Sequence, residues 1–327
     1  MKPKIYVTRV LPGDSFRTLF EKYDVELNES DLAPDEKTLI EKIRDKDGLL
    51  CLLTDKITKS VIDAGGRLKI IANYAVGYDN IDVDYATQKG IMVTNTPGVL
   101  TDATAELTWA LILGCARRIT EGDRFTREGK FIGWSPTLFL GYELKGKTLG
   151  IIGAGRIGTK VGMIANGFEM KIIYCDKKRN TMLEEKLGAN KVELHALLQD
   201  ADFVTIHVPL TKETYHLIGK KELGLMKPTC VLVNTSRGAV IDEHALVGAL
   251  KEHRIAYAGL DVYEFEPKIS PELISLDNVI LLPHIGSATF RARTAMADIA
   301  IKNLETGLRG KIPPNLVNPE VLRYLKQ

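Results

Sequence analysis

The chain has 327 residues, of which 45% are hydrophobic and 26% charged, an ordinary balance for a soluble globular protein. The formal net charge is +2, so overall charge does not favour binding to nucleic acid or to a membrane surface. The length is sufficient for two domains at roughly 100–200 residues each.

Four cysteines are spread through apolar stretches: Cys51, Cys115, Cys175 and Cys230. None has the short spacing of a zinc site or a redox pair, so we expect buried, reduced thiols and no bound metal. The sequence enters a predicted strand at once, without the apolar core of a signal peptide, and it contains no run long enough to cross a bilayer. We therefore expect a cytoplasmic protein.

The first hundred residues alternate short apolar strands with helical patterns. Strands are expected at Ile5–Thr8, Leu49–Leu53, Ile70–Asn73 and Ile91–Asn95, and helices at Ser15–Lys22, Leu39–Asp45 and Thr58–Ala64. Strands separated by helices predict βαβ units and a parallel sheet. The strand runs are continuously apolar, which is typical of strands covered on both faces.

A long helix is expected from Thr101 to Arg118, after a break at Thr96-Pro97-Gly98. Its apolar residues go nearly all the way round, which is typical of a helix buried on more than one side. Part of this helix is expected to pack against a second subunit. The stretch from Phe131 to Tyr142 contains Trp134 and several turn-forming residues, which indicate a loop.

The stretch from Thr148 to Asp176 reads as strand, glycine turn, helix, strand and acid. Gly153 makes the tight turn, Gly155 lets the backbone approach a pyrophosphate, and Gly158 allows close packing of helix and strand. The carboxylate of Asp176 is placed to accept hydrogen bonds from a ribose. This context predicts a dinucleotide site, whereas the glycine motif alone would be a weak signal.

Strands and helices alternate again after this stretch. Strands are expected at Phe203–His207, Cys230–Asn234, Ala258–Asp261 and Val279–Leu282, and helices at Leu194–Leu198, Lys220–Leu225, Glu243–Lys251 and Thr289–Gly307. With the two strands of the dinucleotide stretch this makes about six, the size of a full doubly wound dinucleotide-binding domain.

Charged side chains follow three of these strands, at the edge where open α/β sheets bind ligands. Arg237 follows the strand that ends at Asn234, and its guanidinium is suited to hold a carboxylate with two donors. Glu266 follows the next strand, and His284 lies between a proline and a glycine after the last one. Taken singly, each residue also fits a structural or solvated role.

Together these residues fit the reduction of a 2-oxo acid, which needs a hydride donor, a cation for the carboxylate or carbonyl, and an acid for the developing alkoxide. A carboxylate beside a histidine raises the pKa of the imidazole above about 6.5, which keeps the ring protonated near neutral pH. Glu266 and His284 supply such a pair, and Arg237 supplies the cation. His207 is expected to line the cofactor site and not to be the acid.

Several motifs occur in a specific order and spacing: Asn73–Asp82, Asn95–Glu106, Gly153–Gly158, His207–Thr214, Asn234–Ala239, Gly259–Glu264 and Pro283–Ser287. Through them the chain resembles the D-isomer-specific 2-hydroxyacid dehydrogenases, and within these the glyoxylate/hydroxypyruvate reductases. The likeness runs from Lys4 to about Asn318. It implies two doubly wound parallel-sheet domains: a Rossmann NAD-binding domain, residues 99–287, inserted into a flavodoxin-like substrate-binding domain, residues 1–98 and 288–327.

The resemblance also implies the site residues. Arg237 binds the substrate carboxylate and keto oxygen, His284 is the general acid, and Glu266 orients His284, while the amides of Val76 and Gly77 hold the carboxylate. Thr104 and Gly286 are implied to lie beside the cofactor, and Asp261 to bond its nicotinamide amide. The full implied cofactor set is Thr104, Gly153, Gly155, Arg156, Ile157, Gly158, Asp176, His207, Val208, Pro209, Thr214, Thr235, Ser236, Arg237, Asp261, His284 and Gly286.

Assembly and motion follow from the same resemblance. Hinges are implied near residues 98–101 and 286–289, and closure about them would exclude water from the substrate. A homodimer is expected through the 101–118 helix and the 131–142 loop. Trp134 then either reaches the neighbouring subunit's substrate pocket or packs at the interface.

The choice of nicotinamide cofactor depends on one turn. Asp176 favours NAD(H), because its carboxylate pairs with the ribose hydroxyls and repels a 2′-phosphate. Lys177-Lys178-Arg179 follows directly and is able to attract a phosphate. We favour NAD(H), since repulsion by a close carboxylate should outweigh attraction by exposed side chains, and NADP(H) stays open.

The expected activity is reduction of glyoxylate or hydroxypyruvate, giving a D-2-hydroxy acid where a stereocentre exists. Leu52 or Leu53 and Tyr74 are expected to wall the substrate side chain. The alternative enzymes are a short 3-phosphoglycerate dehydrogenase or another D-2-hydroxyacid dehydrogenase. Against the first, this chain has Tyr74 where such enzymes usually have a small residue. The alternative of another class is an NAD(H)-sensing, corepressor-like binding protein, because some corepressors keep the Arg, Glu and His set.

Overall fold

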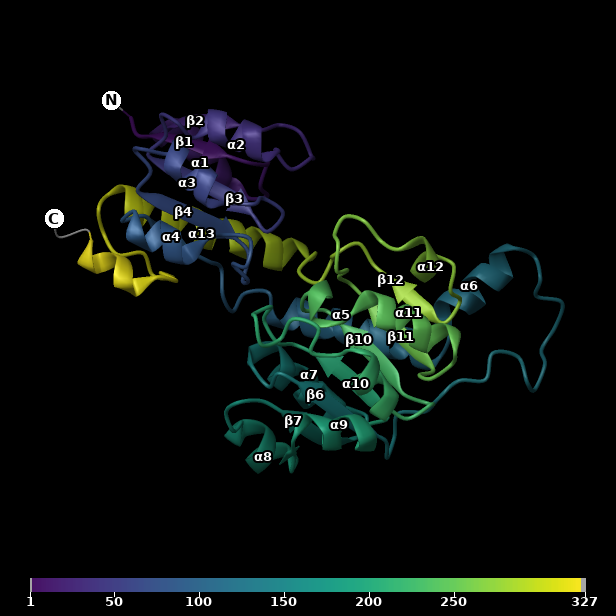
Figure 1. Ribbon diagram of the computed structural model, residues 1–327. Helices are drawn as coiled ribbons and strands as arrows, with labels where there is room; N and C mark the ends of the chain where they lie inside the picture. Colours follow the sequence, from purple (N-terminus) through teal and green to yellow (C-terminus); the bar gives the residue numbers. More distant parts are fainter. Residues whose placement is uncertain (1, 325–327) are drawn as a thin grey trace. The chain divides into compact units, whose positions relative to one another are not determined.

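The computed structural model describes residues 2–324, and these form two compact units (Figure 1). One unit holds the residues up to Leu100 together with those from Ala288 onward, and the other holds Thr101–Ser287. Each unit is built on one parallel sheet covered by helices, which confirms the predicted fold class. The chain of the first unit is therefore interrupted by the whole of the second.

The first unit has a five-stranded sheet in the order β2-β1-β3-β4-β5, in which all pairs are parallel. Its strands are β1 (Lys4–Val7), β2 (Asp24–Leu27), β3 (Gly48–Leu52), β4 (Ile70–Tyr74) and β5 (Met92–Thr94). Successive strand residues contribute to two separate cores, so both faces are covered. One face packs on α1 (Asp14–Lys22) and α13 (Phe290–Leu308), the other on α2 (Glu36–Lys42), α3 (Lys59–Ala64) and α4 (Val83–Gln88).

The second unit has a seven-stranded parallel sheet in the order β12-β11-β10-β9-β6-β7-β8. Its strands are β6 (Thr148–Ile152), β7 (Lys171–Cys175), β8 (Asn190–Lys191), β9 (Phe203–Ile206), β10 (Val231–Asn234), β11 (Tyr257–Leu260) and β12 (Val279–Leu281). The sheet again separates two cores. The helices on one side are α5 (Thr101–Ala116), α7 (Arg156–Gly167) and α8 (Thr181–Leu187), and on the other α9 (Leu194–Asp200), α10 (Lys220–Leu225), α11 (Glu243–Lys251) and α12 (Pro271–Ile274).

The packing of helix α5 explains why its apolar residues go nearly all the way round. Ten of its 16 residues are buried, and it contacts α7 as well as β10, β11 and β12. Trp109 stacks on Phe168 with ring centroids 4.7 Å apart, and its indole N–H donates to the carbonyl of Val161 at 3.1 Å. Much of the helix is thus interior to its own unit. The helix ends at Ala116. Arg118 has a left-handed backbone conformation, and α6 (Ile119–Arg127) begins directly after it.

The structure contains elements that the sequence did not predict: β2, β8, α4, α6, α8, α12 and the short helices η1 (Gly238–Val240) and η2 (Pro319–Arg323). The second sheet has seven strands instead of about six because two-residue β8 pairs at the edge with β7. The helix expected at Leu39–Asp45 runs from Glu36 to Lys42, since the side chain of Asp35 accepts from the Thr38 amide and fixes its start. Short edge strands and capped single turns carry too little periodicity to be recognised.

The cysteines are unpaired, and three of them are buried as expected. Burial raises the pKa of Cys115 and of Cys230 to about 12, so these thiols stay protonated. Cys175 is only partly buried, contrary to expectation, because it ends β7 where its carbonyl meets the amide of Gly153. Residues 2–324 contain no group of three or more His, Cys, Asp or Glu side chains placed to hold a metal ion. No helix in the same range has the length and apolarity required to cross a membrane.

Candidate active site

The carboxyl ends of all strands in the second sheet meet at one edge, because every strand pair is parallel. The residues that the sequence placed after these strands therefore share this edge. In spatial order they are Asp176 after β7, Gly153 after β6, His207 after β9, Arg237 after β10, Asp261 after β11 and His284 after β12. The glycine turn and Asp176 lie toward one end of this series, and the candidate acid lies at the other.

The glycine turn has the conformation that a dinucleotide requires. Gly153 has a φ of +92°, and a Cβ added to Gly158 would lie 2.1 Å from the carbonyl oxygen of Gly153. A Cβ on Gly155 would meet no atom within 4 Å, so open space adjoins the backbone there. The N-terminus of α7 has no side-chain cap, which leaves the first-turn amides of Arg156, Ile157 and Gly158 available to a phosphate. The turn therefore fits a pyrophosphate.

Asp176 is fixed by backbone donors. One carboxylate oxygen accepts from the amide of Ala154 at 2.8 Å and the other from the amide of Lys178 at 3.0 Å. The same turn is tied to the glycine loop by Asn180, whose amide donates to the Ala154 carbonyl at 2.8 Å and to Thr159 Oγ1 at 2.6 Å. The carboxylate is thus held beside the glycine turn and is not free to swing away.

His284 and Glu266 form a hydrogen-bonded pair, with Nδ1 of the imidazole 2.9 Å from Oε2 of the carboxylate. The other oxygen of Glu266 accepts from the Tyr263 amide at 2.9 Å, which fixes the carboxylate. Burial alone would raise the pKa of Glu266, but the hydrogen bond and charge of His284 outweigh burial, so its pKa lies below the ordinary value. His284 has a φ of +54°, and Nε2 makes no hydrogen bond within residues 2–324. One ring nitrogen is therefore oriented by the carboxylate and the other is available to a ligand.

Arg237 belongs to the same cluster. Its positive charge helps to hold the pKa of Glu266 below the ordinary value. The Arg237 carbonyl accepts from the side-chain amide of Asn234 at 2.8 Å, and one guanidinium nitrogen donates to the Ser236 carbonyl at 2.8 Å. The structure thus brings Arg237, Glu266 and His284 together within the second unit.

Gly238 makes this cluster sterically possible. A Cβ at this position would lie 1.8 Å from the carbonyl carbon of Tyr263 and 2.4 Å from the amide nitrogen of Glu264. Two main-chain segments therefore touch directly: the one that carries Arg237 and the one that leads to Glu266. Any side chain larger than hydrogen would separate them.

Asp261 braces the loop that carries His284. Asp261 is only 1% exposed, and its two carboxylate oxygens accept from the amides of Ile285 and Gly286, each at 2.7 Å. Burial raises the pKa of Asp261, although both amides favour its charged form. Thr104 donates its hydroxyl to the carbonyl of Gly286 at 3.1 Å. The sequence did not predict this bracing, and the predicted contact of Asp261 with a nicotinamide amide stays a prediction.

Both ring nitrogens of His207 are buried at this edge, although the residue as a whole is partly exposed. Burial lowers its pKa to about 3, so the ring is neutral at ordinary pH, and neither ring nitrogen has a hydrogen-bond partner within residues 2–324. Its backbone lies against the glycine turn, since a Cβ on Gly153 would lie 2.8 Å from the His207 carbonyl carbon. A buried imidazole without partners beside that turn fits a site that another molecule completes.

The remaining predicted cofactor residues lie in two short loops at the same edge. After β9, the hydroxyl of Thr214 donates to the carbonyl of Pro209 at 2.6 Å, which closes the turn that follows Val208. After β10, the hydroxyls of Thr235 and Thr108 lie 2.9 Å apart, and Ser236 bonds Asn234 through its amide and its hydroxyl. These contacts within the protein fix the shape of both loops.

Three further residues anchor the loop of Glu266, and the sequence did not predict this role. Glu264 accepts from the amide of Glu243, and Glu243 in turn accepts from the amide of Glu264, each at 3.1 Å. His216 Nε2 lies 2.7 Å from the other oxygen of Glu264. Glu264 is thus paired and largely shielded, with 7% of its side chain exposed. Its partners lie 21 and 48 residues away, so no local pattern could have revealed them.

In the first unit, the loop after β4 carries Val76 and Gly77. Their carbonyls accept from the side-chain amides of Asn95 at 2.8 Å and Asn73 at 2.9 Å. Their own amides form no hydrogen bond within residues 2–324, which leaves two adjacent donors. Asn80 closes the loop by donating to the Leu52 carbonyl at 3.0 Å.

Tyr74 does not have the position expected of a pocket wall. Its side chain lies in the core of the first unit, 3% exposed, and its hydroxyl donates to the carbonyl of Arg293 in α13 at 2.8 Å. The expectation was wrong because the residue ends β4 on the face that packs against α13. Leu52 and Leu53 are both partly exposed.

Comparisons with known proteins all indicate the same enzyme family. The family model described as "D-isomer specific 2-hydroxyacid dehydrogenase, NAD binding domain" matches residues 109–286. The glyoxylate reductase of Thermococcus litoralis is 55% identical over 98% of both chains, and that of Pyrococcus furiosus is 51% identical over 100% of this chain and 98% of its own. A solved NADPH-dependent glyoxylate/hydroxypyruvate reductase of Sinorhizobium meliloti, in complex with NADP and malonate, has a TM-score of 0.88 at 32% identity, with 98% of each chain covered.

A doubly wound parallel sheet with a glycine turn of this geometry is typical of dinucleotide-binding α/β proteins. The chain belongs to the D-isomer-specific 2-hydroxyacid dehydrogenases, and the resemblance inferred from its motifs is confirmed. It is an NAD(P)-dependent enzyme that reduces 2-oxo acids to 2-hydroxy acids.

The Glu266–His284 pair predicts a pH-dependent contribution to stability. Because its pKa is lowered in the folded protein, the carboxylate stabilises the fold fully above its ordinary value of 4.5, and this stabilisation is lost as pH falls through the lowered value. We expect Glu266→Gln to reduce the free energy of unfolding at pH 7 by about 1–3 kcal/mol, because a hydrogen bond to a charged group is lost. Urea denaturation at a series of pH values measures this difference.

The difference between wild type and variant should shrink below about pH 4.5. Glu272→Gln, which alters an exposed acid on α12, is the matched control and should change stability little at any pH. A difference for Glu266→Gln that stays constant down to pH 3 would contradict the lowered pKa.

Proposed function

We propose that this chain reduces glyoxylate or hydroxypyruvate, with His284 as the general acid, to glycolate or the D-2-hydroxy acid. The observation that carries the proposal is the cluster of Arg237, Glu266 and His284 at the same sheet edge as the dinucleotide turn. The printed names of the relatives from Thermococcus litoralis and Pyrococcus furiosus, both glyoxylate reductases, support the substrate class. We also propose that the second unit binds the cofactor and the first the substrate.

Each residue has a distinct task in this proposal. The nicotinamide cofactor supplies the hydride when it is bound. Nε2 of His284 donates a proton to the oxygen that becomes the hydroxyl, while Glu266 holds the ring in position through Nδ1. The guanidinium of Arg237 binds the substrate carboxylate and polarises the carbonyl. The amides of Val76 and Gly77 serve as further donors to the carboxylate.

The proposal also covers the cofactor. The glycine turn with the open α7 amides would hold the pyrophosphate, and Asp176 would accept hydrogen bonds from the adenosine ribose. Because backbone amides hold the Asp176 carboxylate in place, a 2′-phosphate would meet a fixed negative charge. We therefore favour NAD(H), although the Sinorhizobium meliloti relative is NADPH-dependent by its printed name.

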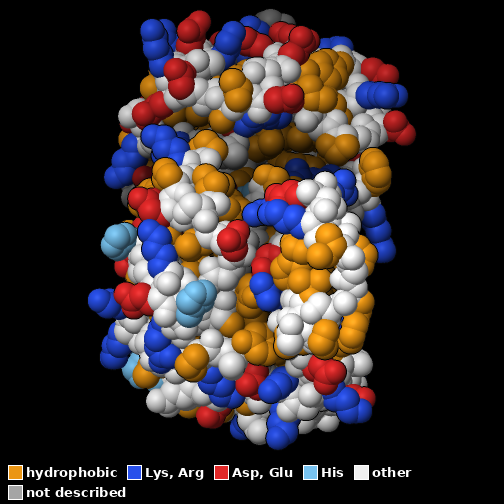
Figure 2. Space-filling model, turned by 90° about the vertical axis from the view of Figure 1, so that its right-hand side faces the viewer, with side chains coloured by type: hydrophobic (Ala, Val, Ile, Leu, Met, Phe, Trp, Pro, Cys, Tyr) orange, Lys and Arg blue, Asp and Glu red, His pale blue; other side chains and the backbone are white. Residues whose placement is uncertain are grey.

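We further infer a homodimer through the loop that follows α6. Its apolar residues are strongly exposed, with Ile132 at 99% and Trp134 at 84%, and Phe131 and Leu140 are also exposed. Figure 2 shows hydrophobic side chains gathered on this face of the molecule. Exposed apolar groups in such density are typical of a surface that a second subunit covers.

Activity assays with the His284→Ala variant test the function. Wild type should oxidise NADH with glyoxylate or hydroxypyruvate, and the variant should lose roughly 10²–10⁴-fold in kcat, because the proton donor is absent, while its dissociation constant for NADH changes little. His195→Ala, an exposed histidine on α9, is the matched control. Absence of turnover by wild type with a panel of 2-oxo acids would refute the proposed substrate class, and an unchanged kcat in His284→Ala would refute the assigned acid.

Exchange of Asp176 for serine tests the cofactor preference. Removal of the carboxylate should raise kcat/KM with NADPH relative to NADH by about tenfold or more, since 1.4 kcal/mol of relieved repulsion corresponds to a factor of ten. Steady-state kinetics with both cofactors measure the ratio. Asp200→Ser, at the exposed end of α9, removes the same charge elsewhere and should leave the ratio unaltered. If the ratio is the same in wild type and Asp176→Ser, Asp176 does not recognise the ribose.

Sedimentation velocity tests the dimer. Wild type should sediment as a dimer, and Ile132→Asp should shift it toward the monomer, because a buried charge at the interface lacks a partner. Ile274→Asp places the same charge on exposed α12 and should leave the dimer intact. A monomeric wild type at micromolar concentration would argue against this interface.

A further inference from the structure

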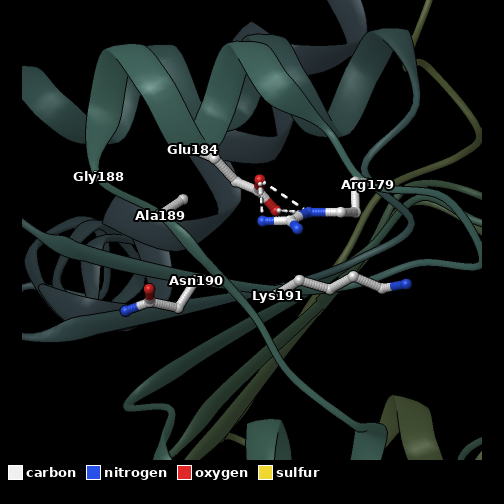
Figure 3. Close-up of a pocket in the computed structure, with 6 residues that line it drawn as sticks. All are labelled: Arg179, Glu184, Gly188, Ala189, Asn190 and Lys191. Carbon is white, nitrogen blue, oxygen red and sulfur yellow. Dashed lines mark hydrogen bonds and ion pairs between the residues drawn. The ribbon is translucent and has the colours of Figure 1, made fainter.

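The turn after β7 carries three cations directly behind Asp176, and one of them lies beside a cavity. This cavity, of about 590 Å³, is lined by Arg179, Glu184, Gly188, Ala189, Asn190 and Lys191. In Figure 3 the side chains of Arg179 and Glu184 point toward one another, while that of Lys191 extends away from them. Asp176 and Asn180, which lie on either side of Arg179 in the sequence, both bond main-chain atoms of Ala154 at 2.8 Å, so Arg179 belongs to a turn held against the glycine loop. The side chain of Arg179 is therefore long enough to reach a group beside the Asp176 carboxylate.

Arg179 is instead held by Glu184. Its Nη2 and Nε lie 2.8 Å and 3.1 Å from the same oxygen of Glu184, and Nε lies 3.3 Å from the other. Glu184 is fixed in turn, because the hydroxyl of Tyr174 donates to its Oε1 at 2.5 Å. Tyr174 is buried in the core, and its hydroxyl accepts from the amide of Asn180 at 2.8 Å. The acceptor of the arginine is thus anchored to the sheet itself.

The first cation of the turn is held much less firmly. Lys177 pairs with Glu213 at 2.8 Å, but the side chains are 81% and 71% exposed. The side chains of Arg179 and Glu184, in contrast, are 76% and 17% exposed, so in this pair the carboxylate is shielded although the guanidinium is not. Exposed single-point pairs stabilise little, whereas a fork-shaped contact with an anchored carboxylate restricts the guanidinium in both position and direction. Among the cations of this turn, Arg179 is therefore the one whose placement the fold controls.

We propose that Glu184 is a specificity-determining residue that holds Arg179 away from the adenosine ribose, so that the cation is withheld from a 2′-phosphate. The inference rests on the proposed function, in which Asp176 meets that ribose. Cofactor choice then has two components: repulsion by Asp176 and sequestration of the arginine by Glu184. The fork geometry that suits a carboxylate suits a phosphate equally well, so release of Arg179 provides a phosphate ligand in the same turn.

Other charges nearby do not replace this control. Lys191 donates to the Lys177 carbonyl at 3.3 Å, and the exposed side chain of Lys178 has no acidic partner within residues 2–324 that would fix its position. Glu185, the neighbour of Glu184 on α8, is exposed and has no hydrogen bond or ion pair within residues 2–324. Glu185 is therefore a matched control that removes the same charge from the same helix without releasing the arginine.

The test measures dissociation constants of NADH and NADPH by nicotinamide fluorescence, which does not require turnover. The variants are Glu184→Gln, Glu184→Ala, Glu185→Gln and the double variant Glu184→Gln/Arg179→Ala. Glu184→Gln should tighten NADPH binding by about 3- to 10-fold and leave NADH binding within about twofold. Glu184→Ala should shift binding in the same direction. The double variant should lose the gain, because the gain requires the released guanidinium.

Three outcomes would overturn the inference. One is an unchanged ratio of the two dissociation constants in both Glu184 variants that retain the wild-type circular dichroism spectrum. Another is an equal gain in Glu185→Gln, which would show an unspecific effect of charge. The third is a gain that survives removal of Arg179. Failure of wild type to bind either cofactor would instead overturn the proposed function, and this inference with it.

Discussion

The parallel pairing of the second sheet is the constraint on which the site depends. All seven strands run in one direction, so each strand delivers the residue that follows it to the same edge. From β7 to β12 there are five steps of about 4.8 Å, roughly 24 Å in all. One edge therefore accommodates both the carboxylate that we propose to bind the ribose and, well away from it, the proposed proton donor. A reversed strand anywhere between them would send its residue to the opposite edge.

Backbone donors and acceptors do much of the positioning at this edge. Asp176, Asp261 and Glu266 each accept from main-chain amides before any ligand is present. Preorganised groups of this kind need not reorient when charge develops during a reaction. At this edge, Nε2 of His284 and both ring nitrogens of His207 have no hydrogen-bond partner within residues 2–324. In the first unit, the side-chain amides of Asn73 and Asn95 hold the loop of Val76 and Gly77 in a comparable way.

The sequence was sufficient for the fold class, and the residues that it singled out after the strands lie at one edge of the second sheet. Continuous apolar runs predicted parallel strands, and the residues after them could be assigned to one edge because topology fixes their direction. What sequence could not provide were contacts between loops distant in the chain, such as His216 with Glu264 or Asp261 with the amides around Ile285. Tyr74 was misplaced for a related reason. Its neighbours along the strand do not reveal that α13, more than two hundred residues later, covers its face.

The contact at Gly238 has a consequence for how such a site can diverge. Because peptide groups, and not side chains, set the spacing between the Arg237 segment and the Tyr263–Glu264 segment, that spacing is a fixed dimension of the catalytic cluster. Substitutions elsewhere are able to line the pocket with larger or smaller groups, but they do not change the distance between these two main-chain segments. A change of substrate would then come from the pocket walls, while the segment of Arg237 keeps its distance from the segment that leads to Glu266.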